Sequence, residues 1–349
     1  MITDAHVFQD DHVPDRLLHR DAEVGVLARA FEPALAGSAP DDVVIHGPHG
    51  VGKSVLARHT FDRLQSRATA DWAHVHAMGL STAGVVRATL QELGADPAPT
   101  TPQEDLCLQL RERVDQPTVV VLDEGDELPG AALDRLLDVP LVGVAPIVHD
   151  VDHWLSRLDD SVRRRLTAVK LELDRYPVDE LADILAPRAR KGLRGSVPRS
   201  YLETVADRAA GGARRGIQTL RAAGEIAGER ECAVSDVDVD AAHARALRRI
   251  RELNLQSLTV HHHVLYELIR AAGSITPEDL NDRYDRVADQ VYDGRGAVPV
   301  GRRQRRTKLR KLDEYGLIDR AEHRHDVHEV RDAGVASDVV SLPAGVSTD

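Results

Sequence analysis

Apolar and polar positions alternate in two distinct ways along the first half of the chain. Consecutive or alternating apolar residues predict five strands, at 42–46, 72–76, 118–122, 141–149 and 169–173. Apolar residues at helical spacing predict helices around them, at 24–35, 54–61, 81–90, 104–114 and 155–166. Because strands and helices alternate, we expect an α/β domain with a parallel sheet. Pro146, inside the fourth strand, suggests an edge position or a bulge.

The pattern changes twice in the second half of the chain. Beyond residue 176 only helices are indicated, at 178–190, 197–210, 213–228 and 237–253. From residue 258, three more helices and a weakly alternating segment at 319–330 are typical of a winged helix. We therefore expect an α/β domain, a helical lid, a winged-helix domain and a flexible tail, at 1–174, 175–254, 255–332 and 333–349.

The composition is acidic and poor in lysine. Formal net charge is −12, and lysine occurs at five positions only. Such a surface suits a salt-rich cytoplasm, where repulsion between acidic groups is screened, so a halophilic source is our hypothesis. An acidic N-terminus and the lack of an 18-residue apolar run predict a cytoplasmic protein without a membrane segment. Two scattered cysteines, Cys107 and Cys232, exclude a disulfide framework and a cysteine zinc site.

A glycine-rich segment follows the first predicted strand. Its sequence GPHGVGKS fits the phosphate-binding loop GxxxxGK[ST], and it comprises Gly47, Pro48, His49, Gly50, Val51, Gly52, Lys53 and Ser54. Glycines let backbone amides surround an anion at the start of the next helix. Lys53 can reach the outer phosphates, and the Ser54 hydroxyl can ligate Mg²⁺. The segment predicts binding of ATP or ADP with Mg²⁺.

Two carboxylates follow the third predicted strand. Four consecutive apolar residues lead into Asp123 and Glu124, so these acids lie at the carboxyl end of a central parallel strand. In phosphate-loop ATPases this is the place of the group that organises Mg²⁺ and of the group that activates water. We expect Asp123 to hold the ion through its water shell and Glu124 to polarise the attacking water.

One segment near the C-terminus is strongly basic. Seven of the ten residues at 302–311 are cationic, and the predicted DNA contacts are Arg302, Arg303, Arg305, Arg306 and Arg310. On a helix, Leu309 and Leu312 face inward while the arginines at 303, 306 and 310 share an outward face. Such a helix can grip phosphates and read guanine edges in the major groove of double-stranded DNA.

Two groups of histidines invite a metal interpretation. They are His261, His262 and His263, and His323, His325 and His328. Adjacent helix positions point about 100° apart, so the first group cannot converge on one ion. The second group falls on the predicted wing. We expect structural roles for both.

Taken in order, these segments resemble the archaeal origin-recognition (Orc/Cdc-type) replication initiators, AAA+ ATPases with a C-terminal winged helix. The resemblance spans about residues 12–330 and includes both nucleotide motifs, with LDEGDEL at 122–128 as the second. Val13-Pro14 and HRDAE at 19–23 are similar to the segment on the adenine side of the nucleotide. The resemblance therefore implies nucleotide contacts from Val13, Pro14 and Arg20.

Three more segments carry the resemblance. LDDSVRRRL at 158–166 resembles the arginine-finger segment, which implies a catalytic Arg165 or, next, Arg163. GARRG at 212–216 is similar to the sensor 2 helix and implies that Arg214 senses the nucleotide. His149 stands where the family's sensor 1 residue is usually Asn, and Ser161 stands where another arginine is common. Both departures concern turnover more than nucleotide binding.

The resemblance implies an ATP-regulated DNA-binding protein that initiates replication at origins, with slow hydrolysis switching its conformation. Its implied partners are double-stranded origin DNA, other initiator copies and the replicative helicase. Two alternatives stay open. One is a hydrolysis-deficient paralogue that acts as a DNA-binding regulator. The other is a signalling or transposon-helper AAA+ ATPase that uses its winged helix for protein contacts.

Overall fold

The chain forms two compact units in the computed structural model, Met1–His243 and Ala244–Asp349. Residues 1–320 and 327–343 are described by the structure. Among these residues, no helix has the length and apolar character needed to cross a membrane.

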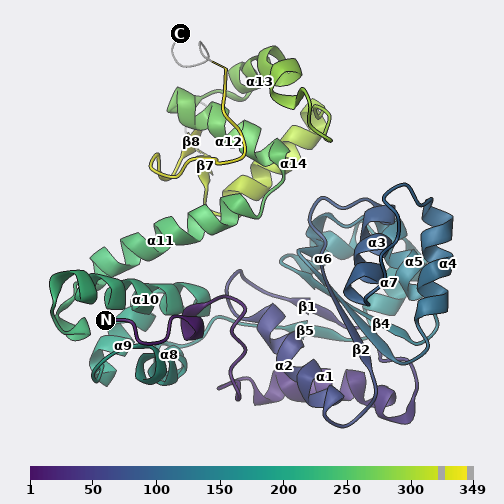
Figure 1. Cartoon of the computed structure of the whole chain (residues 1–349), viewed down its shortest axis with the longest axis horizontal. Helices are drawn as coiled ribbons and strands as arrows, with labels where there is room; N and C mark the ends of the chain where they lie inside the picture. The colour runs from purple at the N-terminus through teal and green to yellow at the C-terminus, as the bar shows by residue number, and fades with distance from the viewer. Residues whose placement is uncertain (321–326, 344–349) are drawn as a thin grey trace. The chain divides into compact units, whose positions relative to one another are not determined.

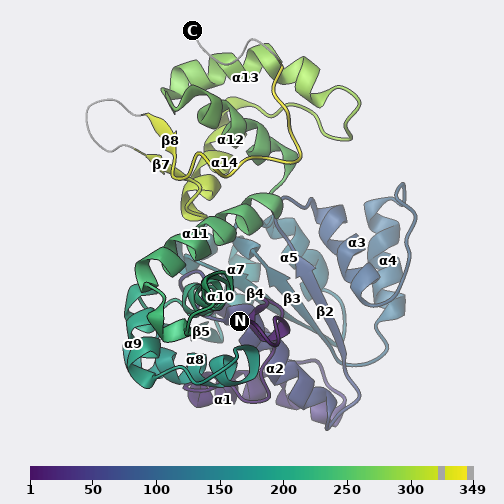
Figure 2. The ribbon, with the colours of Figure 1, turned by 60° about the vertical axis from the view of Figure 1, so that its left-hand side comes forward.

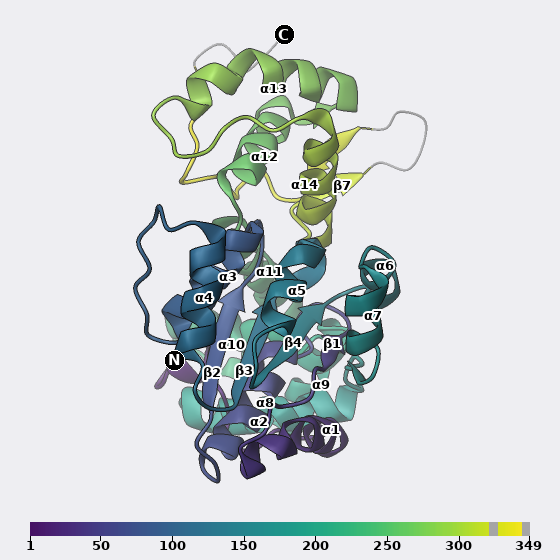
Figure 3. The same cartoon turned by 90° about the vertical axis from the view of Figure 1, so that its right-hand side faces the viewer.

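A five-stranded parallel sheet forms the centre of the first unit. Its strands are β1 (Val44–His46), β2 (Asp71–His76), β3 (Thr118–Asp123), β4 (Val142–Val148) and β5 (Lys170–Glu172). Their order is β2-β3-β4-β1-β5, and Figure 3 shows the first four side by side. Every pairing is parallel. The predicted α/β class with a parallel sheet is confirmed.

Helices cover both faces of this sheet. They are α1 (Asp21–Phe31), α2 (Lys53–Gln65), α3 (Thr82–Glu92), α4 (Gln103–Arg113), α5 (Gly130–Leu137), α6 (Val151–Leu155) and α7 (Asp160–Leu166). Side chains of β3 alternate between two cores: Val120 and Leu122 pack with α3–α7, Val119 and Val121 with α1 and α2. Figure 1 shows the two helix layers on opposite sides. A strand apolar on both faces is therefore required at this central position.

Pro146 lies in the middle of the sheet. Its strand β4 pairs with β3 on one side and β1 on the other, and Pro146 itself stands opposite Leu122. The predicted edge position is therefore wrong. Proline lacks a backbone N–H and so cannot donate a hydrogen bond to a neighbouring strand. The sheet tolerates this loss because other residues of β4 pair with β3 and β1 and the whole strand is buried.

Helices α8 (Val178–Gly192), α9 (Arg199–Arg208) and α10 (Ala213–Arg230) form the lid of the first unit. The N-terminal residues lie on these helices: the Met1 amino group donates a hydrogen bond to Gly224 O (2.6 Å), and Gln218 Nε2 donates one to Phe8 O (2.8 Å). Phe8 is fully buried. The sequence pattern assigns these residues to the sheet domain. Their attachment to the lid through Met1 and Phe8 was missed, because two isolated contacts give no periodic pattern.

The boundary between the units falls inside helix α11 (Val239–Gln256). The second half of this helix is attached to the second unit by polar contacts. Arg251 Nε donates a hydrogen bond to Gly316 O (3.1 Å), and Asn254 Nδ2 donates one to Tyr315 O (3.1 Å). The hydrophobic pattern assigns this half to the lid because such contacts leave no periodic signal.

Three helices and a small sheet build the second unit. They are α12 (Val260–Ala272), α13 (Pro277–Tyr292), α14 (Arg302–Glu314), β6 (Ser274–Ile275), β7 (Ile318–Arg320) and β8 (His328–Val330). The antiparallel sheet has the order β6-β8-β7, and Figure 2 shows β7 beside β8. The Thr276 hydroxyl caps α13 by accepting the Asp279 N–H at 3.1 Å. This is the predicted winged-helix arrangement. Of the three histidines predicted on the wing, His323 and His325 lie outside the described residues.

Val335 and Ser337 contact α12, whereas the sequence pattern predicts a flexible tail from residue 333. Val335 and Val340 are 1% and 3% exposed. Ser337 N–H donates a hydrogen bond to Glu267 Oε1 (2.7 Å), and its hydroxyl lies 2.8 Å from His263 Nδ1. The tail prediction is thus wrong for this stretch, because single valines five positions apart match neither a helical nor a strand period.

His262 makes the second unit sensitive to acid. Its ring is fully buried, and this burial lowers its pKa from 6.5 to about 2. Below pH 6.5 the unfolded chain takes up a proton that the folded chain does not. We therefore expect His262 to lower the free energy of unfolding by about 1.4 kcal/mol per pH unit as pH falls below 6.5.

Urea unfolding at several pH values measures this effect. His262→Gln should unfold with a shallower loss of stability on acidification than the wild type, whereas replacing the exposed His153 should leave the slope unchanged. Equal slopes in all three proteins would contradict the assignment.

Candidate functional site

The phosphate-binding loop joins β1 to α2, as predicted. Gly47 and Gly52 have φ values of 135° and 97°, which side chains rarely tolerate. A Cβ atom on Gly47 would also lie 2.2 Å from Leu173 O. Lys53 is 7% exposed, and its ammonium group donates hydrogen bonds to Gly47 O (2.6 Å) and Pro48 O (2.9 Å). The cation therefore lies inside the loop that would surround a phosphate.

Ser54 and Asp123 meet across the start of α2 and the end of β3. The Ser54 hydroxyl donates a hydrogen bond to Asp123 Oδ2 at 2.5 Å, and His74 Nε2 lies 3.3 Å from the same oxygen. Burial alone would raise the pKa of Asp123, but hydrogen bonds from His74 and Ser54 outweigh it and lower the pKa to about 2. An ionised carboxylate beside a hydroxyl is an oxygen pair suited to Mg²⁺.

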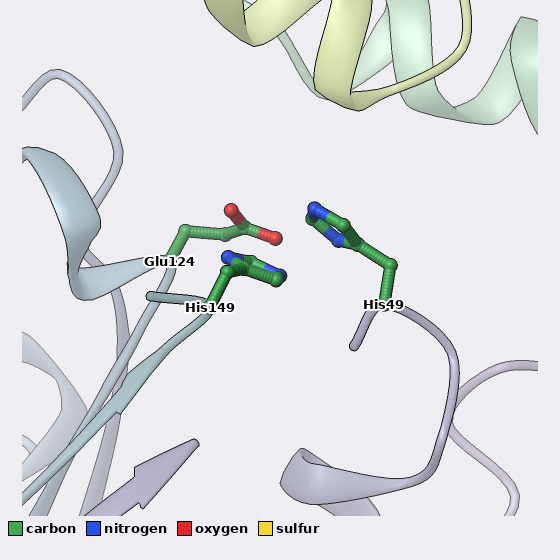
Figure 4. Close-up of side chains that lie close together, drawn as sticks. All are labelled: His49, Glu124 and His149. Carbon is green, nitrogen blue, oxygen red and sulfur yellow. The ribbon is translucent and has the colours of Figure 1, made fainter. Parts of the chain in front are cut away.

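Glu124 follows Asp123 in a left-handed backbone conformation, with φ 56° and ψ 42°. This conformation costs a non-glycine residue about 1 kcal/mol and is concentrated at functional sites. The Glu124 carboxylate faces His49 of the loop and His149 at the end of β4 (Figure 4). Each of the three residues has one potential ligand atom within 4.8 Å of those of the other two.

His149 is held by Asp126. Its Nδ1 atom lies 2.7 Å from Asp126 Oδ2, and its backbone N–H donates a hydrogen bond to Asp126 Oδ1 at 2.8 Å. The His149 ring is stacked on that of His49, with centroids 3.4 Å apart and an interplanar angle of 28°. The residue at the predicted sensor 1 position thus faces the phosphate-binding loop.

Arg214 brings the lid to the loop. Its backbone N–H donates a hydrogen bond to Gly50 O (3.0 Å), and a Cβ atom on Gly50 would lie 3.1 Å from Arg214 Cβ. The Arg214 guanidinium binds Asp10, with an NH2–Oδ2 distance of 2.8 Å. The start of α10 therefore touches the same loop that holds Lys53.

Arg20 connects the N-terminal segment with the strand-to-lid connection. Its guanidinium lies 4.0 Å from the centre of the Tyr176 ring and donates hydrogen bonds to Tyr176 Oη (2.7 Å) and Asp174 O (2.6 Å). Val13 and Pro14 are half-buried. The structure thus gives Arg20 a fixed place at this connection.

The two predicted finger arginines make contacts within their own domain. Arg165 binds Asp42 (2.8 Å) and donates a hydrogen bond to Leu137 O (2.6 Å). Arg163 pairs with Asp160 on the same helix. Neither is brought to the phosphate-binding loop of the same chain.

The basic helix α14 exposes some of its predicted DNA-binding arginines and buries another. The exposed ones are Arg302, Arg303, Arg306 and Arg310. Arg305 is 6% exposed; its guanidinium lies 3.9 Å from the centre of the Tyr284 ring and binds Asp285 and Asn281 Oδ1. The helix period places Arg305 on the inner face, so its structural contacts stand against the predicted DNA contact.

Comparison with known proteins identifies the family. A family model described as an AAA ATPase domain matches residues 16–140. ORC1-type DNA replication protein 9 of Halobacterium salinarum is 32% identical over 334 residues, which cover 91% of this chain and 90% of the relative. The chain belongs to the family of ORC1-type DNA replication proteins. ORC1-type DNA replication protein 1 of the same organism is 31% identical, over 81% of this chain and 95% of its own.

Solved structures of an ORC1 and an ORC2 protein share the fold. A structure of the Aeropyrum pernix ORC1 protein in complex with DNA has a TM-score of 0.70 and 25% identity, and covers 94% of this chain and 93% of its own. The Aeropyrum pernix ORC2 protein has a TM-score of 0.61 and 23% identity, with 95% and 94% coverage. The predicted archaeal initiator resemblance is confirmed, and the acidic composition agrees with relatives from a Halobacterium.

Several polar partners in this ORC1-type chain escape sequence reasoning. They are Asp10 at Arg214, His74 at Asp123, Asp126 at His149 and Asp42 at Arg165. Asp126 could have been found, because it lies within the second nucleotide motif. The other three are distant in sequence from their partners and carry no motif.

Proposed function

We propose that the chain is an ATP-regulated DNA-binding protein that initiates replication at origins. The observation that carries this proposal is the contact of α10 with the phosphate-binding loop, through Arg214 N–H and Gly50 O. A nucleotide bound at the loop would lie between the sheet and the lid. Its terminal phosphate would attract the Arg214 guanidinium away from Asp10 and so change the lid.

The residues around the loop fit ATP with Mg²⁺. Lys53 would turn from the carbonyls that it now binds toward the outer phosphates. Ser54 and Asp123 would hold the ion, since their oxygens are 2.5 Å apart and Asp123 stays ionised. Bound Mg²⁺ would neutralise phosphate charge. Glu124 would accept a proton from the attacking water, at the end of the strand that fixes Asp123.

Glu124→Gln tests whether hydrolysis is part of the function. An amide cannot accept the proton, so we expect turnover to fall about 100-fold while ATP affinity stays unchanged. Single-turnover phosphate release measures the first quantity and fluorescent-nucleotide binding the second. Glu127→Gln, in the same acidic segment, is the control and should retain turnover. Equal turnover in wild type and Glu124→Gln would contradict the assignment of Glu124.

A second candidate is a DNA-binding regulator that keeps ATP bound without hydrolysing it. His149 favours this alternative, because its ring is held by Asp126 and stacked on His49 in place of a sensor 1 amide. Under this alternative the wild type itself has no turnover to lose. No contact among residues 1–320 and 327–343 favours the signalling or transposon-helper alternative.

Other copies of the chain and a replicative helicase are the proposed protein partners. Arg165 would act on the nucleotide of a neighbouring copy, since in its own chain it binds Asp42. Double-stranded DNA is the proposed nucleic-acid partner. The exposed arginines of α14 would contact it in the major groove.

A further inference from the structure

We propose that His49, Glu124 and His149 form a binding site for a divalent transition-metal ion of the zinc class. The three side chains come from separate parts of the first unit. His49 belongs to the phosphate-binding loop, Glu124 follows β3, and His149 follows β4. Figure 4 shows the Glu124 carboxylate and the two imidazole rings converging on one point.

The ligand set fits such an ion by its chemistry. Two imidazoles and one carboxylate are the three protein ligands of many catalytic zinc sites, in which a fourth position stays open to water. Magnesium prefers oxygen ligands, so this site differs from the pair formed by Ser54 and Asp123. The structure therefore contains two candidate sites of different ligand character.

The geometry requires one imidazole ring to turn, because the His49 and His149 rings are now stacked, with centroids 3.4 Å apart, and a ring nitrogen binds an ion in the plane of its ring. One ligand atom from each of the three residues lies within 4.8 Å of the other two. Tetrahedral zinc places its ligand atoms about 3.4 Å apart, as follows from Zn–N distances near 2.1 Å. Rotation of the side chains about their own bonds can bring the ligand atoms from up to 4.8 Å apart to this separation. The backbone, which two parallel strands and the loop hold in place, does not need to move.

Asp126 supplies the outer contact that such a site requires. Its Oδ2 atom lies 2.7 Å from His149 Nδ1, which leaves Nε2 as the ligand atom. A carboxylate bonded to the second nitrogen of a metal-binding histidine fixes its tautomer and raises its basicity. The second oxygen of Asp126 accepts the His149 backbone N–H at 2.8 Å, which fixes the carboxylate in turn.

Metal binding would act on the proposed ATPase. A carboxylate that ligates an ion cannot accept a proton from water, so an occupied site would inhibit hydrolysis. This consequence rests on the proposed function, whereas metal binding itself does not.

Equilibrium dialysis tests the site directly. The full chain, without nucleotide or DNA, is dialysed against buffered Zn²⁺ at neutral pH. Because the chain has 17 histidines, the decisive quantity is a difference between variants. We expect the His49→Ala/His149→Ala double variant to bind one Zn²⁺ per chain less than the wild type. His153→Ala removes an exposed histidine four positions after His149 and should bind as the wild type does.

Glu124→Gln provides a second variant, which keeps the size of the side chain and both histidines. The substitution should weaken Zn²⁺ binding at least tenfold. Co²⁺ should show tetrahedral absorption when it is bound to the wild type, and this absorption should be absent with the variant. Equal Zn²⁺ uptake by the wild type and the double variant would overturn the proposal. The proposal would also be overturned if the wild type bound no more Zn²⁺ per chain than a folded protein that lacks the cluster. Neither result depends on ATP hydrolysis or DNA binding.

Discussion

Lys53→Ala is expected to weaken ATP binding at least about 100-fold, which corresponds to about 3 kcal/mol. The Lys53 ammonium is 7% exposed and lies between the carbonyls of Gly47 and Pro48. Nothing else described within the loop offers a positive side chain to the outer phosphates. Hydrogen bonds to charged groups contribute about 1.5–3 kcal/mol each, and the loss of charge adds to this.

The measurement is a titration of the full chain with a fluorescent ATP analogue. Lys170→Ala removes an exposed lysine from the neighbouring strand β5 and should bind nucleotide as the wild type does. Thermal unfolding without nucleotide shows whether the Lys53 variant is folded. A folded Lys53→Ala protein with wild-type affinity would contradict a nucleotide site at this loop.

Reversal of Arg303, Arg306 and Arg310 to glutamate is expected to abolish DNA binding, with a loss of at least about 100-fold. The three side chains are exposed on one face of α14. Base and phosphate contacts by arginine are worth about 1–3 kcal/mol each, and glutamate adds repulsion from phosphates. Filter binding at one fixed salt concentration measures the effect.

Total charge alone must be excluded as the cause. The triple reversal lowers the formal net charge from −12 by six units, to −18. The same change at Arg29, Arg63 and Arg67, exposed residues of and near α1 and α2, provides the matched control. Equal loss in both triple variants would show that α14 makes no specific contact. Unchanged binding in the α14 variant would favour a winged helix used for protein contacts.

Much of the fold was predictable because its elements carry strong local signals. Strand β3 is a run of consecutive apolar residues buried on both faces, and Thr276 with Asp279 marks the start of α13. Weak anchors were missed. Phe8 on the lid and Val335 on α12 are single apolar contacts without a period, and Pro146 in a central strand breaks a statistical rule.

The residues of the site that belong to sequence motifs were predictable. Lys53, Ser54 and Asp123 lie together because loop and strand order dictate it. The partners of these and other site residues depend on tertiary contacts, which the spacing of residues along the sequence does not predict. Asp10 reaches Arg214 across more than two hundred residues, and Arg305 turns inward to Asp285 although its neighbours are exposed.

We propose that the bound nucleotide decides how tightly the chain binds DNA. DNA affinity in ATP and in ADP, on origin-flanking duplex and on random duplex, tests it most directly. We predict tighter binding to origin DNA in ATP than in ADP, and loss of that difference in Arg214→Ala. Equal affinity for both duplexes in both nucleotides would contradict the account.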